Sequence, residues 1–431
     1  MRFETEFKRF LDQVVNLSPG RLQTLRDRSA TIGRVLRATD EDRLEVVDAR
    51  AQGSFAQKTI INPIDDRRGF DADLLVECAD RFETVADMLN AIEAALRASA
   101  PHADLVRQKT RCVTLEYAGE FHLDVVPCVT RGNGLEIGNT ETGEWEGTDP
   151  DGYSEWLLRR DAHACNLLVP TIRLCKYLRD YKRRPAIKSV ILSTMLADLA
   201  DERDSGAYTD LPTALVLLLE DLAAWSAQFS EAPYLEEPTC SAELRLGDTD
   251  WPVFVGQVES LARRSREAYN EPDEAQSFAL WRDLFGKRFP APKHRSTQTI
   301  LAPGEQDLYR DFEIPTILTH GVSMDARVRP KKGFRHGPIA SRSPLEKFRT
   351  LVFELRSTTV AQPFDVYWKV KNTGPEATRA GHLRGEITPD NNGLKAMKIE
   401  PTKYAGQHYV ELYVVKDGIC VARARQEVPI A

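Results

Sequence analysis

Residues 52–77 read QGSFAQKTIINPIDDRRGFDADLLVE, and the rest of the chain is interpreted outward from this stretch. Near its end, Asp71 and Asp73 stand two residues apart at the start of the apolar run Leu74–Val76. In an extended strand, side chains two residues apart point to the same face, so both carboxylates aim into one space. The β-prone run that follows predicts a buried strand that holds the pair rigidly.

A second segment, FHLDVVP at residues 121–127, places one more acid, Asp124, among apolar residues. If the two strands are neighbours, three carboxylates converge. Clustered carboxylates repel one another and keep raised pKa values unless a cation lies between them. Carboxylates together with substrate phosphates are the usual ligands of Mg²⁺. The pattern therefore predicts Asp71, Asp73 and Asp124 as metal ligands and catalytic residues, with Mg²⁺, or Mn²⁺ in its place.

Gly53-Ser54 lies upstream of the acids and offers what a triphosphate needs. A glycine lets backbone N–H groups approach phosphate oxygens, and the serine adds a hydroxyl donor. The dipeptide alone carries little information, but its combination with D-x-D and a third strand-borne acid is specific. We therefore expect Gly53 and Ser54 to bind nucleotide.

The order G-S, D-x-D, D resembles the nucleotidyltransferase superfamily that includes DNA polymerase beta. The finer pattern, QGSFAQKT followed by DDxxxFDADLLVE, resembles the bacterial cGAS/DncV-like nucleotidyltransferases (CD-NTases, SMODS type). The resemblance implies an α+β fold with a polymerase-beta-like sheet and a helical half. It also implies an enzyme that makes a cyclic di- or trinucleotide second messenger from NTPs in anti-phage signalling (CBASS) and releases pyrophosphate. A regulatory protein partner and a downstream effector that responds to the product belong to the same expectation.

The resemblance adds two residues to the predicted site. In these families a lysine on a long helix and a serine that opens the next helix reach the donor triphosphate. By matching position they are Lys176, in the amphipathic segment 165–182, and Ser189, in the helix expected from residue 186. A lysine point charge and a hydroxyl at a helix start both suit phosphate. The alternative is a surface lysine and an N-cap serine.

Beyond residue 305 the sequence changes to β character, with aromatic and β-branched segments at 348–355, 364–370 and 409–415. Asp417-Gly418 between two such runs predicts a two-residue hairpin turn. Short strands over this length indicate an immunoglobulin-like β-sandwich, with Trp368 in its core. The run WKVKNTGPEA at 368–377 resembles the C-terminal sensor domain found on some CD-NTases.

The charge is distributed unevenly along the chain. The net formal charge is −7, yet residues 306–431 hold 20 Lys and Arg against 14 Asp and Glu. A small anionic nucleotide is therefore a candidate ligand of this part, although a solvated surface explains the excess equally well. We expect a catalytic core at 1–152, a helical half at 153–290, a linker at 291–305 and the sandwich at 306–431.

The composition is that of a globular protein, and the sequence also indicates where in the cell the protein is found. There is no run of 18 apolar residues and no apolar core in the N-terminal segment, so we expect no membrane association and no signal peptide. Seven cysteines without a C-x-x-C pair favour a reduced, cytoplasmic protein. The scattered histidines argue against zinc.

Three interpretations of function stay open. The first is the cyclic oligonucleotide synthase, the second a nucleotidyltransferase that modifies an RNA end or a protein, and the third a non-catalytic nucleotide sensor. His122, two residues before Asp124, is read either as a nucleotide contact or as a rim residue without a set role. Residues 132–152 are expected to form a loop at the rim of the site. The small last residue, Ala431, resembles a conjugation site, but the strand pattern before it argues against that use.

Overall fold

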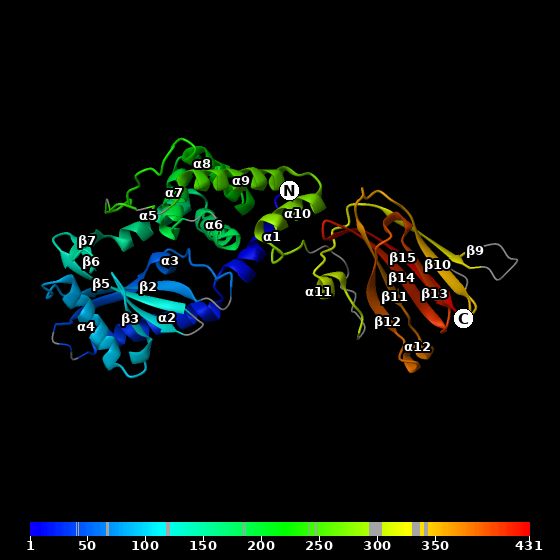
Figure 1. The fold of residues 1–431 in the computed structure, drawn as a ribbon, viewed down its shortest axis with the longest axis horizontal. Coiled ribbons are helices and arrows are strands. Elements are labelled where there is room, and N and C mark those ends of the chain that lie inside the picture. The colour runs from blue at the N-terminus through cyan, green and yellow to red at the C-terminus, as the bar shows by residue number, and fades with distance from the viewer. Residues whose placement is uncertain are drawn as a thin grey trace. The chain divides into compact units, whose positions relative to one another are not determined.

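The structure is a computed structural model that describes residues 1–39, 41, 43–65, 69–117, 121–183, 185, 187–240, 242–244, 246–247, 249–292, 304–329, 337–339 and 344–431. The chain divides into two compact units, residues 2–266 and residues 267–431 together with Met1 (Figure 1). The first unit is a sheet with helices, and the second carries two antiparallel sheets, so the predicted α+β class is confirmed. The finer division at residues 152, 290 and 305 stays a prediction, and residues 293–303 of the expected linker lie outside the described residues.

A mixed sheet forms the centre of the first unit. The strand order is β1-β2-β5-β4-β3, with β6 paired to β5 and β7 paired to β6. β2 and β5 run parallel, whereas the other neighbouring pairs are antiparallel. The bounds are β1 (Val46–Gln52), β2 (Phe70–Cys78), β3 (Val106–Gln108), β4 (Val113–Tyr117), β5 (Phe121–Arg131), β6 (Gly134–Asn139) and β7 (Glu144–Thr148).

The two faces of β2 differ in chemistry. Phe70, Ala72, Leu74 and Val76 are buried in one core cluster with apolar side chains of α2 (Pro19–Arg37) and α4 (Val85–Ala98). Each fully buried aliphatic side chain stabilises the fold by about 1.5–3 kcal/mol. A one-residue slip would move this whole set to the other face, so burial fixes the register and leaves the two acids of β2 on the opposite face.

Helices α5 to α9 lie on the side of the sheet away from α2 and α4 (Figure 1). Their starts have sequence signals: Asp210 caps α8 by accepting a hydrogen bond from the N–H of Thr213, and Pro212 occupies its first turn. The bounds are α1 (Glu4–Phe10), the π-helical η1 (Leu11–Val15), α3 (Gly53–Ala56), the 3-10 helices η2 (Ala103–Leu105) and η3 (Ser205–Ala207), α5 (Pro150–His163), α6 (Leu168–Lys182), α7 (Ser189–Asp201), α8 (Leu211–Ser226) and α9 (Trp251–Asn270).

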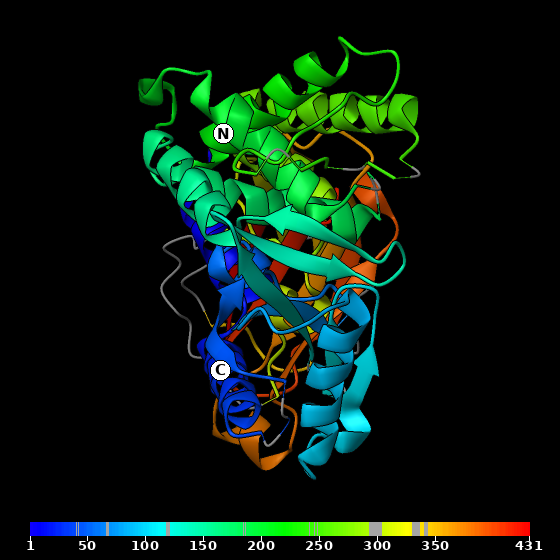
Figure 2. The ribbon, with the colours of Figure 1, turned by 90° about the vertical axis from the view of Figure 1, so that its left-hand side faces the viewer.

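The expectation of a loop at residues 132–152 is wrong. This segment forms the β6–β7 hairpin and the first turn of α5, and Figure 2 shows the hairpin as a pair of teal strands. β6 pairs with the end of β5, from Cys128 opposite Ile137 to Arg131 opposite Gly134. Trp145 lies under the guanidinium of Arg131, 4.0 Å from ring centroid to guanidinium carbon. Pairing with a strand already in the sheet thus imposes β structure on a sequence whose own β propensity is weak.

In the second unit, the described strands form two four-stranded antiparallel sheets, ordered β13-β10-β8-β9 and β12-β11-β14-β15. Trp368 is 1% exposed, and its indole N–H donates to Asp390, which agrees with a core role. The bounds are α10 (Glu274–Phe285), α11 (Leu308–Phe312), α12 (Pro375–Arg379), the 3-10 helix η4 (Gly393–Lys395), β8 (Val322–Val328), β9 (Gly337–Pro338), β10 (Thr350–Thr358), β11 (Asp365–Lys371), β12 (Arg384–Asp390), β13 (Met397–Pro401), β14 (Gly406–Lys416) and β15 (Ile419–Ile430).

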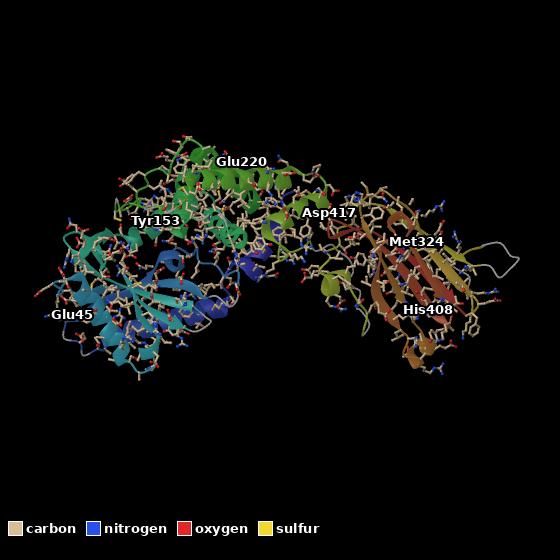
Figure 3. All side chains as sticks on the ribbon, in the orientation of Figure 1. Glu45, Tyr153, Glu220, Met324, His408 and Asp417 are labelled. Carbon is tan, nitrogen blue, oxygen red and sulfur yellow. The ribbon has the colours of Figure 1, made fainter. Side chains whose placement is uncertain are left out.

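The hairpin predicted at Asp417-Gly418 joins β14 to β15, and Figure 3 labels Asp417 at this turn. Both turn residues have positive φ, +51° and +75°, as a type I′ turn requires. After β15 the N–H of Ala431 donates to the carbonyl of Leu345, so the last residue is tied to the sandwich. In the described part of the chain, no helix combines the length and apolarity needed to cross a bilayer.

Candidate active site

A cavity of about 450 Å³ opens on the polar face of β2. Its walls come from the turn between β1 and α3, from β2, and from the facing helices α6 and α7. Six of the seven residues predicted from the sequence line it: Gly53, Ser54, Asp71, Asp73, Lys176 and Ser189. Segments far apart in the chain therefore meet at this cavity, but Asp124, the seventh predicted residue, is not among the residues that line it.

Gly53 lies directly against Asp73. β1 ends opposite Asp73, with Gln52 and Asp73 paired, and Gly53 follows with φ of +60°. A Cβ atom at Gly53 would lie 2.4 Å from Oδ2 of Asp73. Both the left-handed backbone and this close approach require glycine. The turn that carries Ser54 is thereby placed against the carboxylate of Asp73.

The register of β2 and β5 sets the position of the third acid. Asp73 pairs with Asp124, and Asp71 pairs with His122, in parallel strands. Paired residues of neighbouring strands point to the same face, so all four side chains share the polar face of the sheet. On the other face, Phe70 and Phe121 stack with ring centroids 5.3 Å apart, which locks the two strands in this register.

The acids have different surroundings. The side chain of Asp71 is 77% exposed, and its Oδ1 lies 3.4 Å from Nδ1 of His122. Burial, together with the charges of Asp124 and Asp71, raises the pKa of Asp73 to about 7. Among the described residues, no three Asp, Glu, His or Cys side chains stand close enough together to hold a metal ion. The three acids share a face without forming a ready-made cage, and their role as ligands stays a prediction.

The chemistry of this donor set nevertheless suits a divalent cation. Hard cations such as Mg²⁺ prefer carboxylate oxygens, and one or two carboxylates with substrate phosphates commonly complete their shell. A cation between the carboxylates would relieve the repulsion that raises the pKa of Asp73. The residues present therefore fit such a group.

Asp124 has two partners that the sequence analysis missed. Nζ of Lys109 lies 3.1 and 3.3 Å from its two carboxylate oxygens, and the hydroxyl of Thr114 donates to Oδ1. Thr114 pairs with Asp124 across β4 and β5. Lys109 stands on the connection between β3 and β4, so only the folded sheet reveals its contact. Thr114, in contrast, follows from pairing β4 with β5 as a hairpin.

Lys176 is buried, and its ammonium faces the segment that follows the Ser54 turn. Nζ donates to Oγ1 of Thr59 at 2.8 Å and to the carbonyl of Thr59 at 3.2 Å. Burial, helped by the positive charge of Arg179, lowers the pKa of Lys176 to about 7. The reading of a surface lysine is therefore wrong: this residue is 3% exposed.

Ser189 is the first residue of α7, and Lys188 occupies the N-cap position, so the N-cap reading is wrong. The hydroxyl of Ser189 accepts a hydrogen bond from Nη1 of Arg179 at 2.8 Å. Arg179 also donates to the carbonyl of Ile187 and pairs with Asp180. The sequence analysis left Arg179 out of the site. Its spacing from Lys176, three residues along one helix, was the available signal, because such residues share a face.

Two domain families match the chain. Residues 1–160 match the model of the Second Messenger Oligonucleotide or Dinucleotide Synthetase domain (SMODS). Residues 304–431 match the Adenylyl/Guanylyl and SMODS C-terminal sensor domain (AGS_C). The chain is similar to the cyclic AMP-AMP-AMP synthase of Acinetobacter sp. (strain ATCC 27244 / 9458), with 27% identity over 321 residues, 69% of this chain and 90% of that protein.

Solved structures resemble the chain over about two thirds of its length. Vibrio cholerae DncV, a cyclic AMP-GMP synthase, in complex with the linear intermediate 5′ pppA(3′,5′)pG superposes with a TM-score of 0.57 and 14% identity, covering 67% of this chain and 97% of DncV. CdnC of E. coli MS115-1 in its complex with HORMA-deltaN gives a TM-score of 0.54 and 19% identity, covering 67% of this chain and 98% of CdnC. These structures show the polymerase-beta-like fold of a CD-NTase. The two domain matches and the similarity to the Acinetobacter synthase identify the chain as a CD-NTase, a nucleotidyltransferase of the cyclic oligonucleotide synthase family.

Proposed function

We propose that this CD-NTase uses NTPs and Mg²⁺ to make a cyclic di- or trinucleotide second messenger in anti-phage signalling (CBASS) and that it releases pyrophosphate. The observation that supports this best is the single cavity in which the turn at Gly53 meets the acids of β2 and the basic side chains of α6 and α7. The name of the Acinetobacter relative, a cyclic AMP-AMP-AMP synthase, makes ATP the first substrate to test.

The acids would do the following. Asp71 and Asp73 would hold divalent cations against the donor triphosphate, and Asp124 would share the one nearer the acceptor. When bound, such cations neutralise phosphate charge and lower the pKa of the acceptor hydroxyl. Asp124, opposite Asp73 in the sheet, would orient that hydroxyl and accept its proton.

The bond changes are those of an in-line displacement. The acceptor hydroxyl oxygen forms a bond to the α-phosphorus of the donor while the bond from that phosphorus to the bridging oxygen breaks. Pyrophosphate carries away the electron pair, and the hydroxyl proton passes to Asp124. Position and charge neutralisation supply most of the rate in such transfers. A second transfer within the linear product, or a third, would close the ring.

The basic side of the cavity would hold the donor triphosphate. Ser54 and Ser189 supply hydroxyls, and Lys176 and Arg179 supply positive charge close to Ser189 and Thr59. Arg179 was not among the predicted residues, but its contact with Ser189 gives it a part in placing that hydroxyl. These residues restrain the leaving group so that the acceptor can approach in line.

The experiment incubates purified full chain with ATP, each other NTP and their pairs, then treats the products with phosphatase and identifies them by mass spectrometry. A cyclic product survives phosphatase, whereas a nucleotidylated RNA end or protein does not yield one. The double variant Asp71→Asn/Asp73→Asn should fold and lose activity by on the order of 10³-fold or more, since each 1.36 kcal/mol of lost barrier stabilisation is tenfold. Asp27→Asn, an exposed acid on α2, is the matched control. Full activity of the double variant would refute the site.

The third interpretation, a nucleotide sensor, concerns the C-terminal unit. We infer that residues 304–431 bind a small anionic nucleotide. A cavity of about 140 Å³ supports this inference: its polar lining includes His382, Lys403 and Arg384, the last paired with Glu400, and its floor between the sheets is apolar. A comparable apolar cavity in another protein accepts a single aromatic ring. Thermal shifts of the full chain with AMP, compared between Lys403→Glu and the control Lys395→Glu, test it, because the catalytic cavity is the same in both.

We also propose a regulatory protein partner and an effector that responds to the product. The support is that CdnC of E. coli forms a complex with HORMA-deltaN. Co-purification of the tagged chain with the product of a neighbouring gene, followed by comparison of the synthase rate with and without it, tests the first of these.

A further inference from the structure

We propose that Lys109 is a positioning residue of the catalytic site, holding the carboxylate of Asp124 in the orientation that the acceptor hydroxyl needs. This rests on the proposed function of Asp124. Nζ of Lys109 contacts both carboxylate oxygens, at 3.1 and 3.3 Å. The side chain of Asp124 is 19% exposed, so protein groups, more than solvent, set its orientation.

The loop that carries Lys109 is fixed at both ends. The N–H of Lys109 donates to the carbonyl of Cys112, which closes residues 109–112 into a tight turn. The backbone N–H and the hydroxyl of Thr140, just after β6, both donate to the carbonyl of Thr110, each at 3.0 Å. The side chain of Lys109 is 50% exposed, but the backbone that carries it belongs to a supported loop.

A side-chain clamp adds to this support. Arg111 makes a two-pronged ion pair with Glu146 of β7, both bonds at 2.8 Å, and Asn139 donates to the same carboxylate. Two-pronged pairs fix geometry as well as contributing energy. The β6–β7 hairpin thus braces the turn at 109–112, and through Lys109 it acts on Asp124.

The hydroxyl of Thr114 completes the arrangement. It donates to Oδ1 of Asp124, the same oxygen that lies 3.1 Å from Lys109. An acid that must take a proton and face a cation needs one lone-pair direction left open toward the cavity. Both partners contact the Asp124 carboxylate from the β4 side of β5, whereas Asp73 is its neighbour on the β2 side.

Lys109 also forms an ion pair with this acid. One ammonium beside three acids on one face offsets part of their repulsion. Because it shares Asp124 with any cation bound there, its removal leaves a more negative site. A surface ion pair without such a role contributes little, commonly below about 1 kcal/mol. A positioning role predicts that removal of Lys109 changes both metal affinity and kcat, whereas a surface ion pair predicts little change in either.

The test compares Lys109→Met, Lys109→Arg and the control Lys8→Met, which removes the exposed lysine paired with Glu4 on α1. Two quantities are measured: Mn²⁺ affinity of the nucleotide-free protein by calorimetry, and kcat and KM for ATP. For Lys109→Met we expect kcat to fall about 10–100-fold, the usual loss when a residue that orients a ligand is removed. Mn²⁺ affinity should rise about threefold or more, because a repelling charge is gone.

Lys109→Arg should recover kcat to within about threefold of the original chain, since it restores the charge next to Asp124. Lys8→Met should change neither quantity. Unchanged kcat in Lys109→Met, or a fall in Mn²⁺ affinity together with kcat, would overturn the proposal, because the second result describes a damaged fold. If the original chain makes no oligonucleotide, the proposed function fails, whereas the rise in Mn²⁺ affinity still decides whether Lys109 acts on this site.

Discussion

Lys176 of α6 and Thr59, separated by 117 residues in the chain, are joined by two hydrogen bonds from one buried ammonium. The contact ties the helix on one side of the cavity to the segment that continues from the Gly53–Ser54 turn. Because burial lowers the pKa of Lys176 to about 7, its charge depends on what enters the cavity.

Nucleotide binding should therefore be accompanied by proton uptake at Lys176. At pH 8 this group is largely neutral in the free protein, and a triphosphate next to it favours the charged form. Calorimetry of ATP binding in EDTA, in two buffers of different ionisation enthalpy, should show uptake that is largest between pH 7.5 and 9, roughly half a pH unit to two pH units above the lowered pKa. Lys176→Met should abolish the uptake. Equal uptake in that variant would assign the proton to another group.

The same residue makes a prediction about stability. Its pKa in the folded chain, about 7, lies below the ordinary lysine value of 10.5, so the unfolded chain binds more protons between these limits. The free energy of unfolding of the original chain minus that of Lys176→Met should rise with pH across this window, with a maximal slope of about 1.4 kcal/mol per pH unit. Below the window this difference should not depend on pH. Urea unfolding at several pH values measures the difference. A difference that falls as pH rises would contradict the assignment.

Metal binding should release protons, whereas nucleotide binding should take them up. Without a cation the pKa of Asp73 is raised to about 7, so this acid is partly protonated at neutral pH. A bound cation favours the carboxylate and expels the proton. Mn²⁺ titration should release most protons near pH 6 and almost none at pH 9, and nucleotidyl transfer should decline as pH falls below about 7. In Asp73→Asn the release should disappear, and its persistence would point to Asp71 or Asp124.

Gly53→Ala should inactivate the enzyme while leaving a folded chain. The added Cβ would lie 2.4 Å from Oδ2 of Asp73, so the turn or the carboxylate must move. Gly132→Ala is the matched control, because its φ of +61° is almost that of Gly53, +60°, and nothing lies within 4 Å of its added Cβ. Each change costs about 1–2 kcal/mol for the left-handed backbone. Activity should fall at least tenfold further in Gly53→Ala, as 1.4 kcal/mol of misplacement suffices for that. Equal activities of the two variants would show that the close approach of Gly53 to Asp73 is not needed for catalysis.

The strands that carry the acids could be predicted from the sequence. Apolar and polar residues alternate on β2 and β5, and few strand registers bury the apolar ones. The β character of the second unit followed from its short aromatic and β-branched segments, and the β14–β15 hairpin from turn chemistry at Asp417-Gly418. What could not be predicted depends on pairing between distant segments: the β6–β7 hairpin is polar and becomes a strand pair only by joining β5. The contact of Lys109 with Asp124 has the same origin, since the braced turn exists only once β6 and β7 are in place.

A last prediction concerns the second unit, where Glu305 meets two buried lysines. Its Oε1 lies 2.6 Å from Nζ of Lys369, Nζ of Lys371 lies 3.6 Å from Oε2, and the hydroxyl of Tyr409 donates to Oε1 at 2.8 Å. These acid and lysine side chains are 4–5% exposed. Glu305→Gln would leave both ammonium groups without this carboxylate in a dry site, which commonly costs about 3–5 kcal/mol.

Glu346→Gln is the matched control, since its carboxylate pairs with Arg349 while 77% exposed and should cost less than about 1 kcal/mol. Hydrogen exchange of residues 304–431 in the full chain measures both variants. Protection of β11 and β14 should drop by two to three orders of magnitude in Glu305→Gln, roughly the equilibrium change that such a cost implies at 1.4 kcal/mol per tenfold. Similar protection in the two variants would mean that water reaches these lysines, and the carboxylate would then be a surface contact and not an anchor of the strand face.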